Sequence, residues 1–127
     1  MDIRILTPIK FSLSVLEFDE HLPSIRVSVK LEAFGFRYNV LLATEVWVEC
    51  AVFDNFVNCL KERVVAVLSD FDGGFELRVD GVSGNIAWNI FEADSGGGSF
   101  LLKGNKAMSG DQLACLISSF DAYPKWW

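Results

Sequence analysis

The stretch Ser24 to Leu42, SIRVSVKLEAFGFRYNVLL, decides the fold class, because its apolar side chains recur at every second position. Up to Phe34, one face is apolar and the other carries Arg, Ser, Lys and Glu, which is typical of a half-buried antiparallel strand. After Gly35 the alternation begins again. The stretch therefore predicts a β-hairpin, in which Gly35 supplies the unusual dihedral angles of the turn and the neighbouring aromatic side chains pack into the core.

The turn of this hairpin also has the look of an RNA-stacking strand, because Glu32 to Asn39, EAFGFRYN, places three aromatic residues around a glycine. The RNA-recognition signature requires Lys or Arg and then Gly before its first aromatic residue, and an aromatic residue at its last position. Here Glu32 and Ala33 come first and Asn39 comes last. The formal net charge of −6, from 17 acidic and 11 basic side chains, also opposes binding to phosphate backbones. We therefore expect no nucleic-acid partner.

Working outward, the same period of two predicts further strands on both sides of the hairpin. They are expected at 11–15, 45–50, 75–79, 85–93 and 99–104, and the segment VLSDFDGG at 67–74 is interpreted as a loop. Together they predict one curved antiparallel sheet of about six or seven strands, connected as hairpins and meanders.

Two segments have the helical period instead. Apolar residues spaced by three and four positions predict a helix over about 51–64, with Lys61 and Arg63 in its last turn. Ser109 with Gln112 forms a capping box, which predicts a second helix over about 110–121, and Pro124 follows its end. A sheet packed with two helices makes the chain an α+β protein with a single domain, 1–127.

Composition limits the class of protein further. Apolar residues make up 51% and charged residues 22% of the 127 residues, which is typical of one globular domain. The start of the sequence lacks the features of a secretory signal, and no apolar run approaches the ~20 residues that span a bilayer. Cys50, Cys59 and Cys115 have no metal-site spacing, so we expect buried, reduced thiols. A cytoplasmic location and no contact with a membrane follow as expectations.

No catalytic or metal-binding constellation stands out. His21 is the only histidine, and spacing offers it no partners for a triad or a zinc site. Asp70 with Asp72, or Glu92 with Asp94, could be imagined as an acid and base pair or as metal ligands. Both pairs lie in glycine-bearing segments, where a solvated acidic rim is the commoner arrangement. We therefore predict that the protein is not an enzyme and has no cofactor.

The acids are unevenly distributed, which indicates the charge of a partner. Between Val67 and Phe100 the only basic residue is Arg78. The acidic residues of this segment are Asp70, Asp72, Glu76, Asp80, Glu92 and Asp94. If this field steers a partner, that partner is basic.

The four tryptophans raise the question of core or interface, since Trp is both a core filler and a frequent hot spot of binding. Trp88 alternates with isoleucines, which favours the core, and Trp126 and Trp127 are expected to fold back against the sheet. Trp47, between Glu45 and Glu49, lies on a face that is either covered by a helix or offered to a partner.

Several segments taken together resemble a known family. They are EVWVE at 45–49, AVFDNFVNCLKE at 51–62, FELRV at 75–79, LLKG at 101–104 and MSGDQLACLISSFDAYPKWW at 108–127. In their order and aromatic placement they are similar to the small bacterial immunity proteins of the WapI-associated type. The resemblance covers most of the chain from Ser24 onward, whereas the first 20 residues match nothing in the family.

This resemblance implies a protein that binds and neutralises a cognate toxin domain without catalysis. Such a toxin is often the C-terminal part of a large contact-dependent, Rhs-type or type VI secreted effector. On this hypothesis the partner-facing residues are Asp70, Asp72, Glu92 and Asp94, with Trp47, Glu45 and Glu49. Two alternatives stay open at this point: a small-molecule-binding α+β domain with an aromatic-lined pocket, and a structural or assembly subunit.

Overall fold

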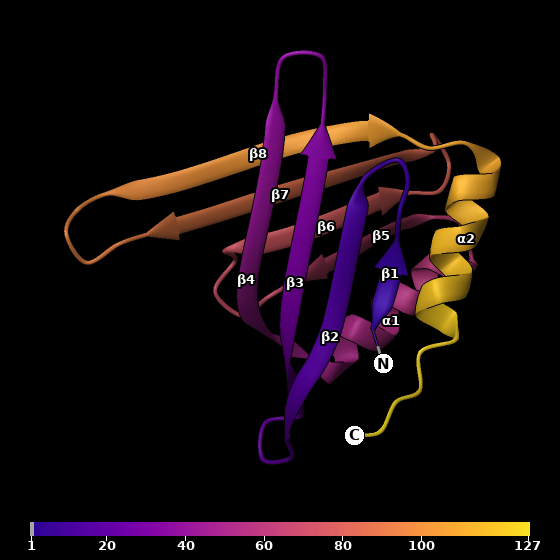
Figure 1. The fold of residues 1–127 in the computed structure, drawn as a ribbon. Coiled ribbons are helices and arrows are strands. Elements are labelled where there is room, and N and C mark those ends of the chain that lie inside the picture. The colour runs from indigo at the N-terminus through magenta and orange to yellow at the C-terminus, as the bar shows by residue number, and fades with distance from the viewer. Residues whose placement is uncertain (1) are drawn as a thin grey trace.

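The computed structural model describes residues 2–127, in which two runs of four strands are each followed by a helix (Figure 1). The first five elements are β1 (Ile3–Ile5), β2 (Lys10–Asp19), β3 (Ser24–Phe34), β4 (Asn39–Glu49) and α1 (Cys50–Lys61). The second five are β5 (Val65–Ser69), β6 (Phe75–Asp80), β7 (Asn85–Ala93), β8 (Ser99–Ala107) and α2 (Gly110–Asp121). Neither helix is long and apolar enough to cross a bilayer, judged on these residues.

The strands form two antiparallel meanders of four, in the orders β1-β2-β3-β4 and β5-β6-β7-β8. We call them sheet 1 and sheet 2. Figure 1 shows that the strands of sheet 1 run across those of sheet 2, and that both helices lie at one end of the pair. Helix α1 carries the chain from one sheet to the other. The β7–β8 hairpin reaches out beyond β4, so that its far end is not covered by sheet 1.

The predicted α+β class with antiparallel strands and two helices is confirmed, but the prediction of one sheet with six or seven strands is wrong. Two strands were missed: β1 has only 3 residues, and β5 was interpreted as a loop. The expected strands on either side of Thr44 are one continuous strand, β4. Alternation shows which face of a strand is buried, but it does not show on which sheet the strand lies.

The core lies between the two sheets and is closed by the helices. Phe120 of α2 lies at the centre of an aromatic cluster, with ring centroids 5.0 Å from Phe56, 6.3 Å from Phe53 and 6.4 Å from Phe11. These rings come from β2, α1 and α2, so the cluster ties both helices to sheet 1. As predicted, Trp88 is buried.

The helix predictions hold with one correction. Helix α1 ends at Lys61 and not at 64, because Arg63 adopts a left-handed φ of 57° that a helix cannot continue through. Helix α2 spans the predicted residues. The Ser109 hydroxyl accepts the Gln112 backbone N–H at 3.1 Å, and the Gln112 side chain accepts the Ser109 N–H at 2.9 Å, so the predicted capping box is present.

The hairpin between β3 and β4 is confirmed, but its turn differs from the prediction. Gly35 is not among the residues with positive φ, and the ring of Tyr38 packs over it: a Cβ there would lie 2.0 Å from a ring carbon, so the ring would have to move. The aromatic side chains do not pack into the core. Phe34 and Tyr38 are each 49% exposed and Phe36 is 98% exposed, because the tip of the hairpin projects past sheet 2.

Two further predictions about side chains are corrected. Of the three free cysteines, Cys50 and Cys59 are half-buried, but Cys115 is exposed on α2. Trp127 folds back, but onto Phe53 of α1, at 5.6 Å between centroids, and not onto a sheet. Trp126 is 56% exposed.

Candidate functional site

A concave site of about 360 Å³ lies between the edge of β4 and the end of β7, and four of the predicted partner-binding residues line it. Glu45 comes from β4, Asp70 and Asp72 from the β5–β6 turn, and Glu92 from β7. These segments are distant in sequence. We call this site the acidic cleft.

Backbone hydrogen bonds hold the β5–β6 turn against both sheets. The Phe71 N–H donates to the carbonyl of Trp47 on β4, at 3.2 Å, and the Phe91 N–H on β7 donates to the carbonyl of Gly74, at 2.8 Å. A Cβ on Gly74 would lie 2.9 Å from the Phe91 carbonyl oxygen, so only glycine allows this approach. The acidic turn is therefore a fixed wall of the cleft.

Asp70 is oriented by the same turn. Its carboxylate accepts the Phe75 N–H at 3.1 Å, and its own N–H donates to the Phe75 carbonyl at 3.2 Å. Asp70 is half-buried, whereas Asp72 and Glu92 are exposed. The position of the Asp70 carboxylate is thus set by the fold before any partner arrives.

Among the described residues, only one of the four carboxylates has a basic partner. Arg26 bonds Glu45 at 2.7 Å and Glu17 at 2.9 Å. These bonds, with that to Glu17 foremost, raise the pKa of the Arg26 guanidinium. Within residues 2–127, none of the ion pairs involves Asp70, Asp72 or Glu92. The cleft therefore presents three uncompensated negative charges to solvent.

Trp47 lies beside a different hollow. It shares the outer face of sheet 1 with Glu45 and is half-buried, on a hollow of about 470 Å³ at the end of the β2–β3 hairpin. The other lining residues are Glu17, Phe18, Asp19, Glu20 and His21. Within residues 2–127, the residues that line this hollow come from β2, the β2–β3 turn and β4, and none comes from α1 or α2. Three of the lining residues, Glu17, Asp19 and Glu20, are acidic, whereas the residue paired with Trp47 on β3 is Arg26.

Two predicted residues lie outside both hollows. Glu49 is exposed at the end of β4, directly before α1. Asp94 lies in the β7–β8 turn, where its carboxylate accepts the N–H groups of Gly96 at 2.9 Å and Gly98 at 2.8 Å. Gly97 in the same turn has a φ of +87°. The structure therefore gives Asp94 a local role, in shaping a tight turn.

Sequence reasoning missed the apolar residues of the cleft. Phe91, which is 48% exposed, lines it, and Phe100, which is 52% exposed, is paired in register with Glu92. The available signal was the run of polar and glycine residues between β7 and β8, which indicates that this hairpin extends into solvent.

Other chemistry is not evident in the part of the chain that the structure describes. Across residues 2–127 no group of three or more His, Cys, Asp or Glu side chains is arranged to hold a metal ion. His21 is exposed, and its backbone N–H donates to Asp19 at 2.9 Å.

Comparison with known proteins gives no relative. No protein-family model matches the chain, and neither the curated proteins nor the solved structures gave a match. The resemblance to immunity proteins therefore depends on the segments quoted above.

Proposed function

We propose that this protein is an immunity protein, which binds a cognate bacterial toxin domain and blocks the toxin's active site without catalysis. The observation that carries the proposal is the convergence of Glu45, Asp70, Asp72 and Glu92 on one cleft, three of them without a basic partner among residues 2–127. A cytoplasmic site of neutralisation is part of the proposal, as the resemblance implies.

The chemistry of the cleft suits a basic partner. Many toxins that act on nucleic acids bind phosphates with clustered Lys and Arg side chains, and fixed carboxylates are complementary to such a cluster. Because the turn that carries Asp70 is pinned to β4 and β7, little ordering of the turn is required on binding. The surrounding negative field would also accelerate encounter.

The cleft itself does not favour the small-molecule alternative. Its wall is acidic and open to solvent, whereas pockets for small molecules are mostly apolar and enclose most of the ligand. The shape of the cleft is more consistent with binding the surface of a second protein.

The proposal is tested by capture and rescue. The tagged protein is used to isolate partners from a lysate of the cells that produce it, and each captured domain is then expressed alone in a sensitive host. We expect one domain that arrests growth, whose toxicity disappears when the wild-type protein is co-expressed.

The matched variants are Asp70→Asn/Asp72→Asn/Glu92→Gln in the cleft, and Glu62→Gln/Asp111→Asn/Asp121→Asn on the helix side, which change the net charge equally. The cleft variant should rescue poorly and the helix-side variant fully. Equal rescue by both variants would remove the cleft from the interface. Capture of the protein itself alone, or of a small molecule, would overturn the immunity proposal.

A further inference from the structure

The open edge of β4 continues from the acidic cleft. In an antiparallel ladder, backbone groups point alternately toward the neighbouring strand and away from it. The carbonyl of Trp47 points away from β3, since it accepts the Phe71 N–H from outside sheet 1. By this alternation Leu41, Ala43 and Glu45 direct their N–H and C=O groups away from β3 as well, and β4 is the last strand of sheet 1 as described for residues 2–127.

The hydrogen bond from the Phe71 N–H occupies this edge only near its C-terminal end, at the carbonyl of Trp47. From Leu41 to Glu45 the edge offers one backbone donor and one acceptor at every second residue. Such an exposed row of donors and acceptors is a template for another strand. Strand β4 is also long, with 11 residues. It contains no proline, and its pairing with β3 has no bulge, so neither feature protects the edge.

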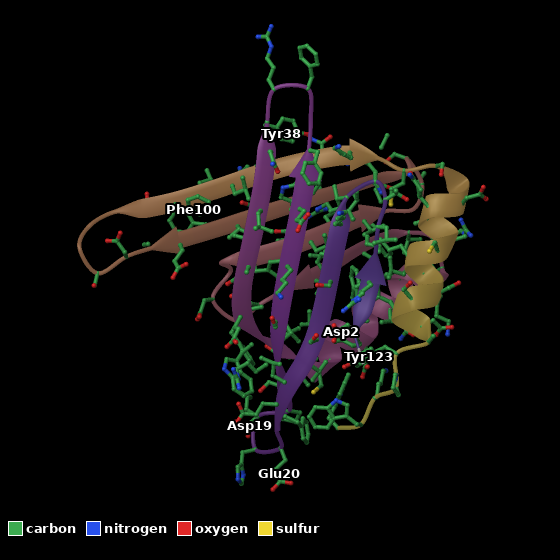
Figure 2. The ribbon with its side chains drawn as sticks, viewed as in Figure 1. Asp2, Asp19, Glu20, Tyr38, Phe100 and Tyr123 are labelled. Carbon is green, nitrogen blue, oxygen red and sulfur yellow. The ribbon has the colours of Figure 1, made fainter. Side chains whose placement is uncertain are left out.

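Beside this edge, the inner face of sheet 2 is left uncovered at the end of the β7–β8 hairpin. Phe100 lies on the same face of β8 as Leu102 and Gly104, which pair with the buried Ile90 and Trp88. It is nevertheless 52% exposed, because the β7–β8 hairpin extends beyond β4 (Figure 1). Figure 2 shows Phe100 on this projecting part of the hairpin. A strand added about 4.8 Å beyond β4 would extend sheet 1 over it.

We infer that a basic, extended segment of the partner adds to β4 as a fifth strand of sheet 1. Its backbone pairs with Leu41, Ala43 and Glu45, its apolar side chains cover the end of sheet 2 that includes Phe100, and its Lys or Arg side chains meet Asp70 and Asp72 at the end of the edge. This recognition mode takes affinity from the main chain and specificity from the side chains. The inference depends on the proposed function for the identity of the partner, which is the toxin domain.

Charge argues against a second copy of this chain as the occupant. Pairing β4 with β4 of a second molecule would bring the Glu45 side chains and both acidic clefts close to one another, and like charges across strands are destabilising. A segment rich in Lys or Arg has the opposite effect.

The first test uses a defined probe, an acetylated and amidated hexapeptide of alternating lysine and valine. In the presence of this peptide, we expect hydrogen exchange at the amides of Leu41, Ala43 and Glu45 to slow at least about tenfold, the effect of about 1.4 kcal/mol of added protection. Two N-methylated versions serve as matched controls, one methylated at the lysines and the other at the valines. Because N–H groups alternate in direction along a strand, only one version should lose binding.

The second test uses the whole protein and the toxin domain from the rescue experiment. Ala43→Pro removes an N–H on the open edge without removing a bond to β3, and Asn105→Pro makes the equivalent change on the open edge of β8. We expect Ala43→Pro to weaken binding about tenfold or more, and Asn105→Pro to leave it unchanged. The peptide controls do not depend on the folding of either variant.

The outcomes separate the two proposals. Equal binding of both N-methylated peptides, or no protection of the β4 amides, would overturn strand addition. Unweakened toxin binding by a folded Ala43→Pro variant would overturn it and leave the immunity function intact. Peptide-dependent protection together with failure to capture any toxin domain would support the strand site and refute immunity. A dimer of the free protein with protected β4 amides would show that a second copy occupies the edge.

Discussion

Neutralising the three uncompensated carboxylates of the cleft should slow association with the proposed toxin partner about eightfold at low salt. The perturbation is Asp70→Asn/Asp72→Asn/Glu92→Gln; Glu45 is left unchanged because Arg26 already compensates it. At about 10 Å from a cation on the approaching partner and with the dielectric constant of water, each charge contributes about 0.4 kcal/mol, and three contribute about 1.2 kcal/mol. Since about 1.4 kcal/mol corresponds to a factor of ten, the expected change is about eightfold.

The assay is stopped-flow measurement of the association rate over a range of salt concentrations. The difference between wild type and variant should be largest at about 0.01 M salt, where the screening length is about 30 Å, and should disappear near 1 M, where it is about 3 Å. The helix-side variant, Glu62→Gln/Asp111→Asn/Asp121→Asn, changes the net charge by the same amount and should slow association much less. An equal effect of the two variants would show that only the net charge matters and would refute the role of the cleft.

Three further predictions concern stability and reactivity. Phe120→Ala should lower the free energy of unfolding by about 3–5 kcal/mol, because it empties the centre of the aromatic cluster, whereas Phe36→Ala should change it by no more than about 0.5 kcal/mol; denaturant titration measures both. Cys115, which is exposed, should react with a thiol reagent at neutral pH faster than Cys50, whose pKa is raised by burial; mass spectrometry of the modified peptides would contradict this if Cys50 reacted first. In the β6–β7 turn, the backbone N–H groups of Ser83 and Val82 donate to the Asp80 carboxylate and lower the pKa of Asp80. The charged form of Asp80 should therefore stabilise the fold at pH values above the ordinary carboxylate pKa. This contribution should be lost as pH falls through the lower pKa of the folded state. Unfolding of wild type and Asp80→Asn across acid pH measures this dependence, and parallel pH profiles of the two proteins would contradict it.

Most strands and both helices could be predicted from the sequence, but the way in which the strands assemble into two sheets could not. The hairpin from Ser24 and the helix from Gly110 were predictable because their signals are local: a period of two, and the side-chain and backbone groups of a capping box. The division into two sheets was not, because nothing in the alternation of β4 or β5 shows that α1 separates the sheets. The exposure of Phe36 and Phe100 follows from where each sheet ends, which is a property of the assembled fold.

The candidate site was predicted in part for the same reason. Counting acids identified Asp70, Asp72 and Glu92, but not that a turn pinned to Trp47 and Phe91 brings them to the edge of β4. Glu45 was chosen for its place next to Trp47, yet the structure assigns the two to different hollows. The open backbone edge, on which the strand-addition proposal depends, has no signal in side-chain identity at all.

The most direct test of the central claim is a calorimetric titration of the purified protein with the captured toxin domain, combined with an assay of that domain's toxicity. The account predicts 1:1 binding with loss of toxicity, weakened in the cleft variant and retained in the helix-side variant. Binding that leaves the toxicity intact, or inhibition that is insensitive to the cleft substitutions, would contradict it.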